Sequence, residues 1–236
     1  TILSFIGVLA AGAKTNAGVL VFNENFNAAD GTTLQGRTPL VGSAWNITSG
    51  ATLIYNNSFD TSQSASYTFA YGGFTQALGT GQQVTLNFTT LPPDSDKFFT
   101  AGWAGVSLYT GGSSGTERIF IGSVGNQPYW GIEGGALSGK QVFNDITNSA
   151  QNVSFQYTYD TGAWSLTVGS ETLTGTAVAN LAINTLRIGG DHNSLANINV
   201  SSVSASVNPV PEPSTYALFG LGAVGMLMVM RRKKTA

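Results

Sequence analysis

The catalytic chemistry open to this sequence is limited by its side chains, because the chain has no cysteine and a single histidine, His192. A retaining glycoside hydrolase needs two carboxyl groups about 5 Å apart. The carboxylates here are scattered, and only Asp94 and Asp96 have the two-residue spacing of neighbours on one strand face. This pair follows Pro92 and Pro93, so a solvated turn is the simpler interpretation. We therefore expect a protein that is not an enzyme.

Metal ligands are also few. The absence of cysteine excludes a thiolate zinc site, and one histidine excludes a histidine cluster. Asp191 and Asn193 flank His192 in a polar stretch after Gly189 and Gly190, where their oxygen atoms are candidate calcium ligands. The spacing of an EF-hand loop is absent, and a plain polar turn is the alternative. No other cofactor is expected.

Aromatic rings are the side chains best suited to binding sugars. The chain has four tryptophans, Trp45, Trp103, Trp130 and Trp164, and in a β domain most such rings fill the core. Tyr129 and Trp130 are adjacent on a predicted strand, where successive side chains point to opposite faces. One of the two rings must therefore face away from the core, and this pair is the candidate glycan-binding site.

The charge distribution argues against nucleic acid as a partner. Charged residues make up 9% of the chain, against roughly 25% in ordinary soluble domains. The basic residues of the central part are too scattered for the continuous positive surface that phosphate backbones require. These residues are Arg37, Lys97, Arg118, Lys140 and Arg187.

The N-terminal residues 1–17 have the pattern of a secretory signal peptide. An apolar run over residues 2–13 has the length of an h-region and ends in small residues. We expect a signal peptidase to cleave after Ala17, with Ala13 as the alternative site. The sequence begins at Thr1 without a basic n-region, so we expect the start of the signal peptide to be missing. A buried N-terminal strand or helix is the competing interpretation.

The C-terminal residues 208–236 contain three parts in a fixed order. Pro211, Glu212 and Pro213 come first, and an apolar stretch then predicts a transmembrane helix over residues 215–230. Its fifteen-residue apolar core rises only about 22 Å, short of the bilayer's ~30 Å, so the flanks must snorkel or the bilayer must thin. Four consecutive basic residues follow and predict a cytoplasmic end, which places the body of the protein across the inner membrane. They are Arg231, Arg232, Lys233 and Lys234.

This order resembles the PEP-CTERM sorting tail of Gram-negative bacteria, with the match covering about residues 210 to 234. The resemblance implies that an exosortase in the inner membrane recognises the Pro-Glu-Pro segment, removes the helix, and releases or transfers the protein to the outside. The two prolines keep the segment extended and deny it helical hydrogen bonds. A simple C-terminal anchor after a Pro-rich linker is the alternative.

The central residues 18–207 predict an all-β, antiparallel sandwich, because short alternating runs are broken by Gly, Asn, Asp and Ser. The clearest signal is a hairpin, with alternation over residues 153–159 and 163–168 around an Asp-Thr-Gly turn. The other predicted strands cover residues 19–26, 45–48, 65–70, 83–89, 101–109, 118–122, 129–133, 171–176, 185–189 and 196–205.

This spacing of motifs resembles the concanavalin A-like jelly roll of lectins and glucanases, including laminin-G-like domains. Three pieces carry the likeness: residues 25–31 followed by Trp45, the strands 118–122 and 129–133, and residues 186–190 followed by 198–203. Hydrolases of that family place Glu, Asp and Glu at alternate positions of one strand, and no such run exists here.

Our leading hypothesis is an exported, non-catalytic protein of the cell surface or extracellular matrix. It is held transiently in the inner membrane, processed by an exosortase, and associated with exopolysaccharide. A lectin-like carbohydrate-binding module is the first alternative. A glycan hydrolase is the second, and it would depend on a carboxylate such as Glu133.

Overall fold

The computed structural model describes residues 18–50, 53–63, 67–92, 102–124, 128–147, 151–191 and 196–210. The predicted signal peptide and the sorting tail from residue 211 onward lie outside these ranges. Within them, no helix combines the length and apolar character needed to cross a bilayer, and the predicted transmembrane helix 215–230 is not covered.

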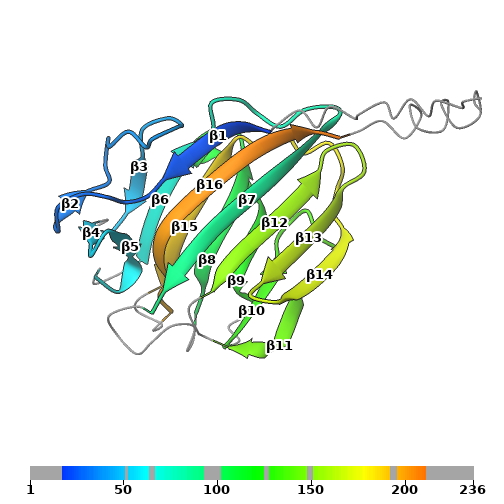
Figure 1. Ribbon diagram of the computed structural model, residues 1–236. Helices are drawn as coiled ribbons and strands as arrows, with labels where there is room; N and C mark the ends of the chain where they lie inside the picture. Colours follow the sequence, from blue (N-terminus) through cyan, green and yellow to red (C-terminus); the bar gives the residue numbers. More distant parts are fainter. Residues whose placement is uncertain are drawn as a thin grey trace, which may run out of the picture.

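Two antiparallel sheets packed face to face form the described part of the chain, which confirms the predicted β-sandwich (Figure 1). The larger sheet has nine strands in the order β14-β13-β12-β7-β16-β5-β4-β2, and β1 pairs with β16. Their bounds are β1 Val19–Glu24, β2 Thr32–Thr33, β4 Leu53–Tyr55, β5 Ser58–Asp60, β7 Gln82–Leu91, β12 Asn152–Thr158, β13 Ala163–Val168, β14 Glu171–Thr176 and β16 Asn199–Pro209.

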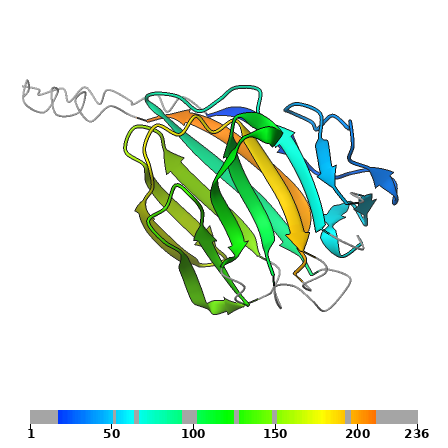
Figure 2. The same cartoon turned by 180° about the vertical axis from the view of Figure 1, so that it is seen from behind.

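The second sheet has seven strands in the order β11-β10-β9-β8-β15-β6-β3, and Figure 2 shows it from its outer side. Two single-turn 3₁₀ helices, η1 (Thr61–Gln63) and η2 (Gly112–Ser114), lie in the connections. The strand bounds are β3 Asn46–Ser49, β6 Tyr67–Gly73, β8 Ala104–Thr110, β9 Thr116–Ser123, β10 Tyr129–Glu133, β11 Gln141–Thr147 and β15 Thr185–Asp191.

The predicted hairpin is present as β12 and β13, with Val153 opposite Val168 and Tyr157 opposite Trp164. The turn closes through Gly162, whose φ of 69° is in the left-handed region that favours glycine. Strands β2, β4, β5 and β11 were not predicted. β4 and β5 are three residues each, too short to show a period of two.

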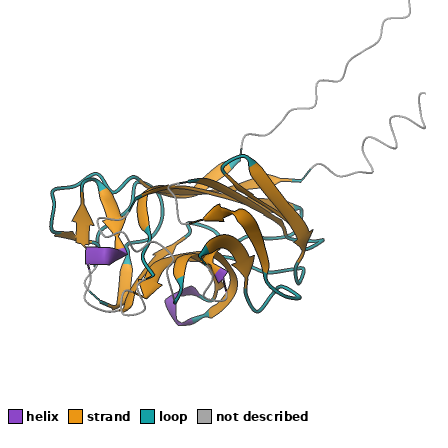
Figure 3. Ribbon diagram, turned by 90° about the horizontal axis from the view of Figure 1, so that it is seen from below, coloured by secondary structure: helices purple, strands orange, loops and turns teal. Residues whose placement is uncertain are grey.

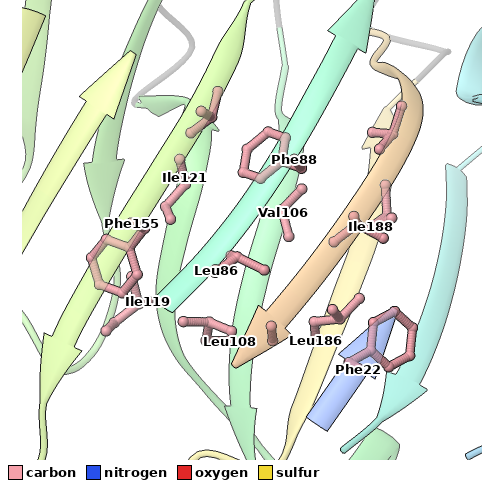
Figure 4. Close-up of a cluster of buried hydrophobic side chains, with 14 of the residues drawn as sticks. Phe22, Leu86, Phe88, Val106, Leu108, Ile119, Ile121, Phe155, Leu186 and Ile188 are labelled. Carbon is pink, nitrogen blue, oxygen red and sulfur yellow. The ribbon is translucent and has the colours of Figure 1, made fainter. Parts of the chain in front are cut away.

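The hydrophobic core lies between the sheets (Figure 4). It consists of side chains that point inward from every second position along the strands. On β7, for example, Leu86 and Phe88 are buried, while Asn87 between them is exposed. Leu108, Ile121 and Ile188 of the opposite sheet are also completely buried. Burial of this apolar surface is the main source of stability for such a sandwich.

A buried carboxylate connects β1 to the segment before β3. Glu24 is fully buried, and its Oε1 accepts hydrogen bonds from the backbone N–H groups of Asn25 (3.0 Å) and Phe26 (2.9 Å). Its Oε2 accepts a hydrogen bond from the Trp45 indole at 3.1 Å, and Arg37 forms an ion pair with the same carboxylate at 3.1 Å. Glu24 therefore has a structural role.

The two ends of the described chain lie together. Val19 of β1 pairs with Val207 of β16, and Gly18 is in contact with the side chain of Asn208. Figure 3 shows the same sandwich from below, with its strands in orange. The sequences that precede residue 18 and follow residue 210 are thus joined to neighbouring strands.

Candidate functional site

Three of the four tryptophans belong to the core. Trp45 is 1% exposed, Trp130 0% and Trp164 4%, as expected for most large rings in a β domain. The prediction of Trp130 as an exposed glycan-binding ring is therefore wrong, because its ring lies between the sheets, 6.1 Å from that of Phe88. Tyr129 is the partner that turns outward, and it is half-buried.

The fourth tryptophan, Trp103, is only partly buried and lies on the outer side of the seven-stranded sheet, just before β8. Its ring stacks on that of Phe69 from β6, with centroids 4.9 Å apart and an interplanar angle of 7°. The Tyr67 ring lies nearly parallel to both, 6.2 Å from Phe69 and 6.4 Å from Trp103. Phe120 of β9 approaches Trp103 edge-on at 6.3 Å. These rings form an aromatic platform on the sheet surface.

A row of four glycines forms the floor beside this platform. Gly189, Gly105, Gly122 and Gly131 lie opposite one another on β15, β8, β9 and β10. A Cβ at Gly189 would lie 3.1 Å from the Trp103 ring, and one at Gly105 would lie 2.9 Å from that of Phe120. The rings can therefore lie close to the backbone only because these positions carry no side chain.

Arg187 of β15 connects the platform to the polar groups. Its guanidinium carbon lies 4.9 Å from the centroid of the Trp103 ring and 5.1 Å from that of Phe69, within cation–π range. Its Nη2 donates to Ser107 Oγ at 2.9 Å and also to Glu117 Oε2, which makes an ion pair. Its Nε is buried and has no acceptor within the described ranges.

Tyr109 completes this arrangement, because its hydroxyl donates to Glu117 Oε2 at 3.2 Å. Burial raises the pKa of the Tyr109 phenol well above its usual value, although the positive charge of Arg187 opposes the shift. The phenol therefore remains a hydrogen-bond donor at neutral pH. Glu117 is held on one side by a cation and on the other by a neutral donor.

The platform and these polar groups enclose a hollow of about 280 Å³. Glu133 of β10 reaches this hollow and makes no hydrogen bond or ion pair with the residues that the structure describes. This volume is just below the range of small-molecule sites, which suits one sugar unit of a longer chain better than a fully enclosed ligand. The lining residues are Phe69, Trp103, Glu117, Phe120, Glu133 and Arg187, and we call this site the aromatic groove.

Of the two candidate calcium ligands, only Asp191 lies among the residues that the structure describes. Asp191 is the last residue of β15 and is 4% exposed, and its backbone N–H donates to the Trp103 carbonyl at 2.9 Å. Asn193, like the predicted turn at Asp94 and Asp96, lies outside the described residues. The described ranges contain no group of three or more His, Cys, Asp or Glu side chains placed to hold a metal ion. The calcium site stays a prediction.

Most of the aromatic groove was missed by sequence reasoning, which had named Glu133 only as one example of a carboxylate. Trp103 and Arg187 are 84 positions apart, and only strand register brings them together. The sequence carried one signal for the groove. Glycines occupy outward positions of strands whose neighbouring residues belong to the core, such as Gly105 before Val106. Without the pairing of the strands, these glycines cannot be recognised as one row.

The architecture described above defines a concanavalin A-like jelly roll of the kind found in lectins and glucanases. The seed lectin of Lotus tetragonolobus aligns with a TM-score of 0.50 and 9% identity, covering 78% of this chain and 100% of the lectin. The lectin from Bauhinia forficata in complex with GalNAc gives 0.51 and 12%, covering 77% and 97%. An endo-1,3-beta-glucanase from Streptomyces sioyaensis gives 0.50 and 10%, covering 86% and 100%.

The chain carries the PEP-CTERM protein-sorting motif at residues 209–233, which confirms the resemblance of its C-terminal tail. This motif marks an exported protein of the cell envelope that an exosortase sorts through its C-terminal tail. No curated protein sequence matches the chain. The structural similarities, all at low identity, establish the fold, and the motif indicates export to the cell envelope.

Proposed function

We propose that this exported protein binds a glycan in the aromatic groove and acts as a non-catalytic component of the cell surface or extracellular matrix. The observation that carries the proposal is Trp103, a partly exposed ring that stacks on Phe69 and lies against glycine backbone. Such a ring can stack on the apolar face of a sugar, while Arg187 and Glu133 supply hydrogen-bond partners for hydroxyl groups.

The fold supports this proposal. The similar structures include a lectin in complex with GalNAc, so the jelly roll is a scaffold on which sugar binding occurs. A glucanase with the same fold keeps hydrolysis as the competing function. The fold alone does not distinguish sugar binding from hydrolysis. The side chains of the groove are needed to distinguish these two functions.

The carboxylates of the groove favour binding over hydrolysis. Glycoside hydrolysis needs one carboxyl group as an acid and a second as a nucleophile or base. Glu117 is paired with Arg187 and accepts a hydrogen bond from Tyr109, which leaves it poorly placed to take part in proton transfer. Glu133 is the one groove carboxylate that has no such partner within the described chain.

The sorting tail extends the proposal to the place where the protein acts. We expect the leader to direct export and the C-terminal helix to hold the protein briefly in the inner membrane. Exosortase cleavage near Pro211–Pro213 then frees the sandwich to associate with exopolysaccharide. The support for this step is the sorting motif at residues 209–233.

A glycan array probed with the full-length protein, in a detergent without sugar headgroups, tests the proposal. We expect Trp103→Ala to reduce binding of at least one glycan at least tenfold, on the assumption that a sugar ring stacked on tryptophan contributes as much as a stacked nucleic-acid base, about 1–3 kcal/mol. Glu133→Gln, which keeps the shape of the groove, should change the preference among glycans. Tyr55→Ala, a change of a partly exposed ring on the distant β4–β5 hairpin, is the matched control.

Two results would overturn the proposal. The first is that no glycan on the array loses binding in Trp103→Ala relative to Tyr55→Ala. The second is release of reducing sugar from a bound polysaccharide that stops in Glu133→Gln, which would establish a hydrolase. Circular dichroism of each variant shows whether the sheets are intact, so that a loss of binding is not mistaken for unfolding.

A further inference from the structure

The outer side of the nine-stranded sheet, which faces the viewer in Figure 1, carries an unusual set of side chains. On β7, β12, β13, β14 and β16, the outward residues that alternate with the core are Ser, Thr, Asn or Gln, with Leu91 and Ala163 the exceptions. None of them is charged. We call this surface the uncharged face, and it lies on the opposite side of the sandwich from the aromatic groove.

Strand register arranges these side chains in rows across the sheet. One row runs from Thr167 through Ser154 and Asn87 to Ser204, and Asn23 of β1 continues it. Neighbouring strands are about 4.8 Å apart, so hydroxyl and amide groups recur at that interval along the row. Such a row presents a regular series of hydrogen-bonding groups perpendicular to the strands.

The sheet surface along this row is concave. A depression of about 410 Å³ has all five of these residues in its wall, and Thr89 and Asn152 form its neighbouring row. Thr89 Oγ1 donates to Asn152 Oδ1 at 3.0 Å, so this second row is partly satisfied within the protein. The depression is larger than the hollow of the aromatic groove and lies within the range of ligand sites.

The central groups of this depression have no hydrogen-bond partner among the described residues. The side chains of Asn23, Asn87, Ser154 and Ser204 make no hydrogen bond with any residue that the structure describes. They supply two amides, each with donors and an acceptor, and two hydroxyls, which both donate and accept. The depression is therefore a site of mixed donors and acceptors without charge.

The chemistry of the ligand follows from these groups. A charged ligand would lose hydration without gaining a counter-charge, and an apolar ligand would cover amides and hydroxyls that need partners. A neutral polyhydroxylated ligand satisfies both conditions, because its adjacent hydroxyls also donate and accept. We propose that the depression on the uncharged face binds a segment of a neutral oligosaccharide, as a second site independent of the aromatic groove.

The test uses side-chain amide signals of the ¹⁵N-labelled full-length protein, in a detergent without sugar headgroups. The probes are laminarihexaose, cellohexaose, maltohexaose and mannohexaose, with an oligogalacturonate as the charged comparison. We expect at least one neutral probe to shift the amide signals of Asn87 and Asn23. The oligogalacturonate should leave these two signals unchanged.

Variants that preserve shape identify the site. Asn87→Asp replaces an exposed amide by a carboxylate of equal size, and we expect it to weaken binding of the neutral probe about three- to tenfold through the lost donor. Gln156→Glu makes the same chemical change on the same face, at an exposed residue outside the depression, and should leave affinity unchanged. Trp103→Ala should also leave it unchanged.

Three outcomes would overturn the proposal. One is that no neutral probe shifts the Asn87 and Asn23 signals. Another is that Asn87→Asp and Gln156→Glu weaken binding equally, which would describe a diffuse surface effect. The third is that Trp103→Ala abolishes the shifts, which would place all sugar binding in the aromatic groove. The first two outcomes leave the function proposed for the groove unaffected, so the two proposals fail separately.

Discussion

Replacing Glu24 by glutamine is the most direct test of what holds the first strand to the sandwich. The Glu24 carboxylate meets only donors: two backbone N–H groups, the Arg37 guanidinium and the Trp45 indole N–H. Glutamine has the same size, but it keeps one acceptor oxygen and places an NH₂ group against these donors. The variant therefore leaves buried donors without an acceptor and removes the counter-charge of Arg37.

The expected cost can be bounded from the structure. Removing one partner of a buried ion pair typically costs about 3–5 kcal/mol, because the other charge remains uncompensated. Arg37 keeps 22% of its side chain exposed, so water can solvate part of the guanidinium after the change. We therefore expect the free energy of unfolding to fall by about 3 kcal/mol, a large share of the 5–15 kcal/mol of typical domains.

Urea unfolding followed by tryptophan fluorescence measures this loss, since Trp45 lies in the affected network. Glu171→Gln is the matched control, because this glutamate is exposed at the start of β14, and the change should alter stability by less than about 0.5 kcal/mol. A loss below about 1 kcal/mol in Glu24→Gln, or an equal loss in both variants, would refute the reasoning.

Three further predictions concern pH, valency and processing. Burial raises the pKa of the Tyr109 phenol above the usual 10.0, so the stabilising contribution of the neutral phenol is complete below pH 10 and declines at higher pH. Tyr109→Phe should flatten that decline in pH-dependent unfolding. With sites on both faces, the protein should cross-link a soluble neutral polysaccharide in light scattering, and either Trp103→Ala or Asn87→Asp alone should reduce this cross-linking. Mass spectrometry of the protein from its host should find a C-terminus near Pro211–Pro213, whereas an intact Arg-Arg-Lys-Lys-Thr-Ala end would contradict processing.

The sandwich itself was predictable because its main signal is local. A period of two in apolar residues is visible within one strand, and the β12–β13 hairpin carries it on both sides of a Gly162 turn. The β4–β5 hairpin carried a turn signal that was overlooked. Asn56 and Asn57 both have positive φ, 51° and 55°, and an Asn-rich pair between two strands favours such a two-residue turn.

Trp130 illustrates the limit of local patterns. Alternation indicated that Tyr129 and Trp130 face opposite sides of the sheet, which the structure supports. It did not indicate which side is the core. Alternation divides a strand into two sets of side chains, but only pairing with other strands and burial of one face decide which set points inward. The larger ring occupies the inner face, where it buries the most apolar area.

The sorting tail is determined by the sequence alone, because the order of Pro-Glu-Pro, apolar stretch and basic end is a linear signal within residues 209–233. The aromatic groove was decided only by tertiary structure. Trp103 precedes β8, whereas Glu133 and Arg187 lie on β10 and β15. Their common surface exists because cross-strand register aligns the glycine row beneath them. A linear motif needs only chain order, whereas a groove needs long-range pairing that no local pattern encodes.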